Sequence, residues 1–257
     1  MANLSPYYKE FAPPDLLAPL VGAFWSFSVS VQTNGCIQHR VLPDGCMDVI
    51  FQYQRSPNGE IDDPQLSVYG ATDHFELFEV KPATELVGVR FHPGRAGQFL
   101  KLSASELFRQ EAKAEDCSQA FVRIFDRLCE CRSAAQALRM LQTSLLPLHV
   151  ECEDSISLSI REALRLMSSS KGRMRVSDVA DAVGVSERTL RRGITTAVGL
   201  SPKVLARILR LQHAVSQLRS PNADLCCVAL ECGYTDQAHM GREFQQLAGL
   251  TPKVFTL

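Results

Sequence analysis

Residues 180–202, ADAVGVSERTLRRGITTAVGLSP, and residues 229–252, ALECGYTDQAHMGREFQQLAGLTP, are two copies of one pattern. The spacing Ala180-x3-Gly184 recurs as Ala229-x3-Gly233, 49 residues later, whereas the closing Gly-Leu-Ser/Thr-Pro segment recurs 50 residues later. The one-residue difference falls just after the first glycine, where a turn is expected, and turns tolerate changes of length. An ordered repeat of this kind indicates one structural unit present twice.

The first copy has the pattern of a helix-turn-helix. Ser177 is a plausible N-cap for a helix over residues 178–183, and Gly184 supplies the positive φ of a short turn. Ser186 is expected to cap a second helix over residues 187–198. The apolar face of that helix is predicted from its spacing to contain Leu190, Ile194 and Ala197.

The second copy has the same pattern. A helix is expected to begin at Asn222 or Asp224 and to end at Glu231, with a turn at 232–234. Thr235 or Asp236 then caps a helix over 237–247, whose inward residues are predicted to be Met240, Phe244 and Leu247.

A long helix from Pro202 to about Leu218 is predicted to join the two copies. At about 1.5 Å per residue it would span roughly 25 Å. Such a strut could hold the two second helices near one DNA turn apart, about 34 Å, in successive segments of the major groove. The sequence therefore predicts that one chain reads two adjacent segments of double-stranded DNA.

Side chains off the apolar faces are the candidates for DNA contact. Arginine can bind guanine through two hydrogen bonds, and Gln237 is the best candidate for adenine. Any of the arginines could instead bind phosphate or remain solvated, and His239 could bind DNA or only fill space. Arg207 and Arg210, on the strut, are expected to pair with acidic neighbours or phosphates. The predicted DNA-binding residues are Ser186, Arg188, Arg191, Arg192, Thr195, Gln237, His239 and Arg242.

The charge distribution fits a DNA-binding tail. The net charge of the 257-residue chain is −1. Residues 171–257 contain 12 lysines and arginines against 7 aspartates and glutamates, whereas residues 1–170 contain 15 against 21. Only the tail is therefore expected to meet phosphate.

Residues 160–257 resemble the AraC/XylS family of bacterial transcription regulators. The resemblance implies a seven-helix DNA-binding domain with both recognition helices in the major groove, and recruitment of RNA polymerase, usually as an activator. The matching residues are Val179-Ala180, Gly184-Val185-Ser186, Arg188, Leu190-x-Arg192, Gly199-x-Ser201-Pro202, Ala229, Gly233-Tyr234, His239, Arg242 and Gly249-x-Thr251-Pro252.

Three features depart from the family pattern. Ile194 and Met240 stand where phenylalanine is usual. Gly193 lies mid-helix, which costs roughly 1 kcal/mol relative to alanine. Gln245-Gln246 replaces the commoner Arg/Lys pair, so the second copy is less basic and is expected to anchor phosphate more weakly.

The front of the chain is predicted to be rich in strands. Residues 1–20 look loop-like with one short helix, and β-branched or aromatic runs follow, separated by Gly, Pro, Asn and Asp clusters. Short strands at this spacing favour an all-β sandwich or barrel, and we expect a cupin-like β-barrel. The runs cover residues 21–31, 47–54, 65–70, 75–80 and 86–91.

Residues 40–50, RVLPDGCMDVI, and 88–94, GVRFHPG, resemble an uncharacterised domain found upstream of AraC-type modules, which implies effector sensing. Arg90 and His92 alternate on a predicted strand, so both could point at one ligand, or both could face solvent. Trp25 either lines such a pocket or belongs to the core. These three residues are the candidate effector-binding residues for an unknown small molecule.

After residue 93 the periodicity becomes helical. Helices are expected over 104–109, 119–132, 134–146 and 156–168, with Pro147 and the acidic residues after it as a boundary. The predicted class is α+β. Its parts are a β-rich effector-binding domain (1–105), a helical connector (106–152) and an all-α domain with two helix-turn-helix motifs (153–257).

The remaining features argue against other classes of protein. No secretion signal or membrane-spanning stretch is evident, and the nine scattered cysteines fit reduced thiols, so we expect a cytoplasmic protein. No metal site, cofactor or enzyme activity is expected. Two alternatives stay open: a DNA-reading tail fused to a front domain that does metal-dependent chemistry, and a front domain that only forms homodimers or protein contacts.

Overall fold

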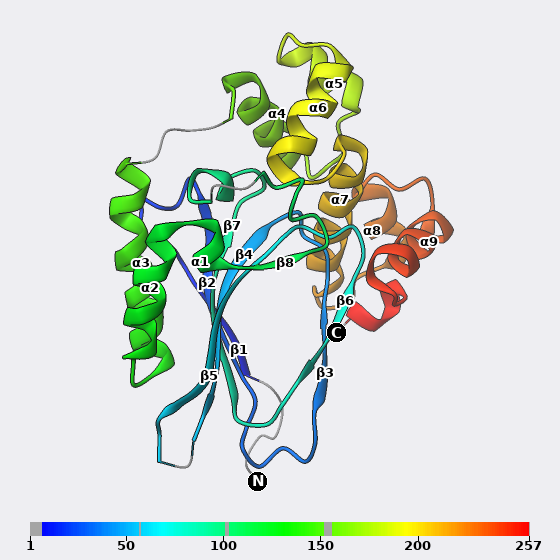
Figure 1. The fold of residues 1–257 in the computed structure, drawn as a ribbon. Coiled ribbons are helices and arrows are strands. Elements are labelled where there is room, and N and C mark those ends of the chain that lie inside the picture. The colour runs from blue at the N-terminus through cyan, green and yellow to red at the C-terminus, as the bar shows by residue number, and fades with distance from the viewer. Residues whose placement is uncertain (1–6, 57, 101–102, 152–155, 257) are drawn as a thin grey trace. The chain divides into compact units, whose positions relative to one another are not determined.

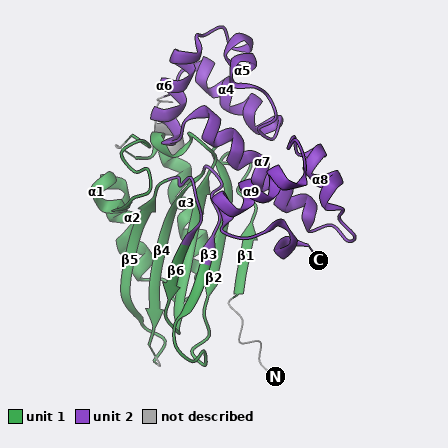
Figure 2. Cartoon of the chain, turned by 90° about the vertical axis from the view of Figure 1, so that its right-hand side faces the viewer, with its two compact units in different colours: residues 1–39, 46–70, 77–155 green, residues 40–45, 71–76, 156–257 purple. Residues whose placement is uncertain are grey.

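The computed structural model describes residues 7–56, 58–100, 103–151 and 156–256. Its contacts divide the chain into two compact units, coloured separately in Figure 2. Unit 1 comprises residues 1–39, 46–70 and 77–155, and unit 2 comprises residues 40–45, 71–76 and 156–257.

Unit 1 is built on an antiparallel sheet of six strands in the order β1-β2-β7-β4-β5-β8, and β3 pairs with β6 in a separate ribbon (Figure 1). The strands are β1 (Tyr7–Phe11), β2 (Val21–Ser28), β3 (Ile37–Val41), β4 (Met47–Arg55), β5 (Ile61–Tyr69), β6 (Glu76–Val80), β7 (Thr84–Phe91) and β8 (Glu111–Lys113).

The five predicted strand runs correspond to β2, β4, β5, β6 and β7, and three strands were missed. β1 lies in the stretch predicted to be a loop with a short helix. Its residues are mostly exposed, so it lacks the alternation that identifies a half-buried strand. Turns at residues 15–20 replace the predicted short helix, with the Leu17 amide donating to the Pro14 carbonyl.

The expected barrel is wrong for the described residues, because the sheet stays open, with β1 and β8 as its edges. The physical reason is that helices cover one face. Phe51 and Val89 of the strands share a core with Phe121, Leu128 and Leu141 of the helices. A sheet that buries its apolar face under helices does not need to close on itself.

The opposite face of the sheet has a smaller apolar cluster. Trp25 and Phe27 of β2 pack there with Val80 of β6 and, less buried, Ile37 of β3. Residues that alternate along a strand therefore pack into two different cores, one on each face of the sheet. The unit is layered as helices, sheet and ribbon.

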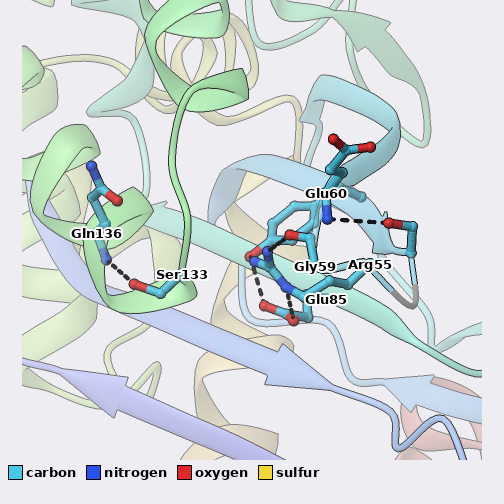
Figure 3. Close-up of polar contacts among 8 residues, drawn as sticks. Arg55, Gly59, Glu60, Glu85, Ser133 and Gln136 are labelled. Atoms are coloured by element: carbon cyan, nitrogen blue, oxygen red, sulfur yellow. Dashed lines mark hydrogen bonds and ion pairs between the residues drawn. The ribbon is translucent and has the colours of Figure 1, made fainter.

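The end of the β4–β5 hairpin is fixed by a small polar network (Figure 3). The Arg55 guanidinium pairs with Glu85 at 2.9 Å and donates to the Gly59 carbonyl at 2.8 Å. Tyr53 donates its hydroxyl to the same carboxylate, and burial raises the pKa of that phenol. Among the helices, the backbone N–H of Gln136 donates to the Ser133 hydroxyl at the start of α3.

The helices of unit 1 are α1 (Ala114–Cys117), α2 (Gln119–Cys129) and α3 (Ala134–Glu151), preceded by the 3₁₀ turn η1 (Ala96–Gln98). α2 and α3 confirm two predicted helices, but α3 continues through Pro147. The expected helix over 104–109 is instead a series of turns.

Unit 2 contains α4 (Leu158–Ser169), α5 (Val176–Ala182), α6 (Glu187–Val198), α7 (Pro202–Leu218), α8 (Leu225–Glu231), α9 (Gln237–Ala248) and the 3₁₀ turn η2 (Pro252–Phe255). The two predicted helix-turn-helix units and the joining helix are confirmed. Two details were wrong: α5 begins after Arg175, so Ser177 is not its N-cap, and Val198 rather than Ala197 completes the buried face of α6.

Residues 40–45 and 71–76 belong to unit 2 by their contacts. The Arg40 guanidinium lies 4.1 Å from the centre of the Phe75 ring and donates to the Ala248 carbonyl at 2.9 Å. This bond satisfies one of the carbonyls left open at the C-terminus of α9. Gln212 of α7 donates to the Pro43 carbonyl at 2.7 Å.

The mid-helix glycine that departs from the family pattern has a packing explanation. A Cβ atom at Gly193 would lie 2.4 Å from Cδ1 and 2.5 Å from Cγ1 of Ile160, a buried residue of α4. α4 therefore packs so closely on α6 that a Cβ atom at this position would displace the Ile160 side chain. Close packing between the two helices offsets the lower helix propensity of glycine relative to alanine.

We predict opposite effects for two glycine substitutions, one in α6 and one in α9. Gly241→Ala should stabilise unit 2 by up to about 1 kcal/mol, because a Cβ there meets nothing within 4 Å. Gly193→Ala should destabilise it by roughly 1 kcal/mol, because overpacking against Ile160 outweighs the same propensity gain. Urea unfolding measures both. Equal changes in the free energy of unfolding for the two variants would contradict this packing. So would a Gly193→Ala variant that loses as much stability in an Ile160→Ala background as in the parent.

Candidate nucleic-acid interface

The two helix-turn-helix units have the same turn geometry. Gly184 and Gly233 both have positive φ, at 68° and 82°. In each turn the next residue donates its amide to an alanine carbonyl of the first helix, Val185 to Ala180 at 3.1 Å and Tyr234 to Ala229 at 2.9 Å. The repeat in the sequence is thus a repeat in the hydrogen bonding of the backbone.

Helix α6 presents its arginines to solvent. Ser186 caps the helix by accepting from the Thr189 amide, and Leu190, Ile194 and Val198 are buried. Arg188, Arg191 and Arg192 are exposed. Within the described ranges, no hydrogen bond or ion pair engages these three guanidinium groups, so their donors are available to a ligand.

Two of the predicted DNA-binding residues also have structural roles. The Ser186 hydroxyl is occupied by its cap and by a 2.9 Å contact with the Thr189 hydroxyl. The half-buried Thr195 donates to the Leu200 carbonyl at 3.4 Å, beyond the end of α6. Their side chains are therefore less available than the arginines.

Helix α9 begins with a cap on Asp236, which accepts from the His239 amide at 2.6 Å. Gln237 is exposed and accepts from the Cys226 thiol of α8 at 3.2 Å. The His239 ring lies edge-on to Tyr234, with 5.5 Å between ring centres, and its Nδ1 contacts Thr235 at 3.3 Å. His239 therefore stabilises the turn from within, whereas Gln237 and Arg242 point to solvent.

The clearest feature that sequence reasoning missed is an ion pair between α7 and α9. Arg207 donates two hydrogen bonds to Glu243, at 2.8 and 3.0 Å, and a third to Gln246 at 2.7 Å. An acidic partner was expected for Arg207, but nothing in the sequence indicated a partner 36 residues away. Because both charged groups are largely buried, the pair fixes where α9 lies on α7.

Tyr234 is buried at the second turn, and the Arg210 guanidinium lies 6.0 Å from its ring centre. Burial raises the pKa of the Tyr234 phenol, so the ring remains neutral. Among the described residues Arg210 therefore contacts an aromatic ring and pairs with no acidic side chain, and its predicted contact with phosphate stays a prediction.

In unit 1, Trp25 and Arg90 meet at a common carboxylate. The Trp25 indole donates to Asp48 at 2.7 Å, and Arg90 Nε lies 3.5 Å from the same oxygen. Arg90 also pairs with Glu10 at 3.1 Å, and Glu10 accepts from the Tyr8 hydroxyl. Desolvation raises the pKa of Tyr8.

Gly88 makes room for this cluster. It is the cross-strand partner of Trp25, and a Cβ at Gly88 would lie 2.3 Å from the indole ring. His92 does not join the cluster by any hydrogen bond or ring contact among the described residues. It lies beyond the end of β7, exposed, with its ring beside Gly22.

The cysteines that the structure describes are all free. Burial raises the pKa of Cys232 to about 11, so its reactive thiolate form is disfavoured. Among the described residues, no group of three or more His, Cys, Asp or Glu side chains is placed to hold a metal ion. No helix in the described part of the chain is long and apolar enough to cross a membrane.

Comparisons with known families divide the chain in a similar way. Residues 179–256 match the model of a helix-turn-helix domain, and residues 9–113 match a domain of unknown function (DUF6597). The first match covers both helix-turn-helix units, from α5 to η2.

Two curated relatives are named as transcription regulators. The chain is 32% identical over 77 residues to a Streptomyces lividans protein described as an AraC-like transcription regulator, which is 30% of this chain and 25% of that protein. It is 33% identical over 75 residues to the transcriptional activator RhaS of Escherichia coli, 29% of this chain and 27% of RhaS. The chain thus spans about a quarter of the length of these relatives.

A solved structure of an AraC-type regulator from Chromobacterium violaceum is also similar. The identity is 26%, the TM-score is 0.36, and the match covers 38% of this chain and 88% of that one.

We predict that Arg207→Met will lower the free energy of unfolding of unit 2 by about 1–3 kcal/mol, because it leaves the Glu243 carboxylate largely buried without a cation. Arg207→Lys should restore only part of the loss, since lysine cannot donate the paired hydrogen bonds. The double variant with Glu243→Met should recover most of the stability. Urea unfolding of the parent, these three variants and the single Glu243→Met variant tests this, and strictly additive effects of the two methionine substitutions would refute it.

Proposed function

We propose that the chain is a member of the AraC/XylS family of transcription regulators and an effector-responsive activator that reads two adjacent major-groove segments of DNA. The observation that supports this best is the pair of helix-turn-helix units with equivalent turns on a shared helix, α7. The exposed, unpaired arginines of α6 supply donors where a recognition helix needs them.

The length of α7 supports the proposed reading of two segments. Its 17 residues span roughly 25 Å, which suits two recognition helices placed near one DNA turn apart. In this proposal Arg188, Arg191, Arg192, Gln237 and Arg242 contact bases or phosphates. Ser186, Thr195 and His239 have weaker support, because their side chains already stabilise the domain.

Activation is proposed by recruitment of RNA polymerase. The support is the similarity to RhaS, which is named as a transcriptional activator.

A regulator of this kind acts where the chromosome is accessible, so the proposed location is the cytoplasm. Residues 1–105, 106–152 and 153–257 are proposed as sensing, connecting and DNA-binding parts, and a homodimer would place two tails on one operator.

Effector control is proposed for unit 1. Arg90 and Trp25 offer a guanidinium and an indole on one face of the sheet, beside the two carboxylates of Asp48 and Glu10. A small polar molecule that exchanged partners with this network would have a different affinity for the two states of the protein, which is what control requires. His92, which lies outside the network, has less support as a ligand-binding residue.

We predict that in vitro selection of random duplexes by the full-length protein will yield a two-part motif with centres about one helical turn apart. Arg188→Ala and Arg192→Ala should each weaken binding to the selected DNA about tenfold, measured at fixed salt, because each removes a base or phosphate contact. Arg139→Ala, an exposed arginine of α3, is the control and should bind like the parent. Unchanged affinity in both tail variants would refute the assignment.

Trp25 is the single tryptophan of the chain, so its fluorescence reports on the proposed effector site alone. In a metabolite screen, a true effector should shift the emission of the full-length protein, and Arg90→Ala should abolish that shift. Arg123→Ala, on the exposed side of α2, should retain it. A compound that changes DNA binding without changing Trp25 emission would place effector binding elsewhere, and the absence of any such compound would favour a ligand-free interaction module.

A further inference from the structure

The two recognition helices correspond residue for residue. Each has 12 residues, follows a polar N-cap at Ser186 or Asp236, and ends at a left-handed glycine, Gly199 or Gly249. Every position of α6 therefore matches the position 50 residues later in α9. Because the solvent-facing positions of the two helices are equivalent, their chemistry can be compared pair by pair.

The outward positions of α6 suit G·C pairs. Glu187, Arg188 and Arg191 are all exposed. Arginine donates two hydrogen bonds to O6 and N7 of guanine, and glutamate accepts from N4 of cytosine. Both side-chain types therefore select the same base pair.

The equivalent positions of α9 contain Gln237, Ala238 and Gly241. Glutamine pairs with N6 and N7 of adenine, and an alanine methyl packs on the thymine methyl group. A Cβ at Gly241 would meet nothing within 4 Å, so the surface there is open and short. At these three positions α9 has no arginine, and the small residues would let the backbone approach the bases closely; Arg242, the equivalent of Arg192, is the one arginine of α9.

Gln237 is already held in a suitable way. Its carboxamide oxygen accepts a weak hydrogen bond from the Cys226 thiol at 3.2 Å. The oxygen has a second lone pair for the N6 amino group of adenine, and among the described residues nothing occupies the Nε2 donors that would reach N7. The thiol therefore restrains the side chain without blocking adenine.

The charge of the residues around α9 also favours contacts with base edges over contacts with phosphate. From 222 to 250 the chain has one basic residue, Arg242, against four acidic ones: Asp224, Glu231, Asp236 and Glu243. With little positive charge for phosphate, α9 must obtain its contribution largely from contacts to base edges.

We infer that the two recognition helices read half-sites of opposite composition, a G·C-containing one by α6 and an A·T-containing one by α9 through Gln237 and Ala238. This inference rests on the proposed two-segment reading of DNA. It adds the identity of the bases and assigns each half-site to one helix.

The test is in vitro selection with the full-length protein, followed by repeat selections with single variants. The parent should enrich a two-part motif with G·C pairs in one half and A·T pairs in the other. Arg191→Ala should relax preference only in the G·C half, and Gln237→Ala only in the A·T half, each by about tenfold in relative affinity. Arg139→Ala should leave the motif unchanged.

A gain of specificity makes the test independent of loss of folding. Gly241→Arg, at the position equivalent to Arg191, should introduce a G·C preference into the A·T half, whereas Gly241→Met, which adds bulk without donors, should not. Half-sites of equal composition, or variants that act on the wrong half, would overturn this inference but leave two-segment reading intact. If no duplex is enriched, sequence-specific binding fails, and the half-site assignment fails with it.

Discussion

Helix α7 is the element on which the rest of unit 2 depends. It contacts α4 and, from the first helix-turn-helix copy, α6, and it contacts α8 and α9 of the second copy. Its buried residues include Leu205, Ile208, Leu211 and Leu218, so both helix-turn-helix units complete their cores against one helix. Sharing one helix lets each helix-turn-helix unit bury an apolar face that it could not cover by itself, as neighbouring structural repeats commonly do. A rigid shared helix also fixes the spacing of the recognition helices.

The two helix-turn-helix copies are packed by different kinds of contact at equivalent positions. At equivalent positions, Gly193 of α6 accepts the buried Ile160, whereas Glu243 of α9 binds Arg207. An apolar contact tolerates salt, and a largely buried ion pair depends on geometry and on both partners being present. The copies have therefore kept the backbone geometry of the turn while their contacts and outward side chains diverged.

The two faces of the sheet in unit 1 differ in chemistry. One face is covered by α2 and α3 and is mainly apolar, while the opposite face combines the Trp25 cluster with the charged network of Asp48, Arg90 and Glu10. Gly88 allows the indole to lie flat across its neighbouring strand. The polar groups are thus placed on a rigid sheet, which suits a binding site better than a loop does.

The sequence by itself determined the α+β class, the two helix-turn-helix units and the bounds of α6 and α7, because caps, left-handed glycines and helical periodicity are local signals. Most strands that alternate were also predictable, whereas β1, β3 and β8 were not, since exposed or short strands lack that pattern. Only the tertiary structure decided that the sheet stays open, that Arg207 pairs with Glu243, that Gly193 accommodates Ile160 and that Arg90 meets Trp25 at Asp48. Each of these depends on contacts between residues far apart in the chain, which no local propensity encodes.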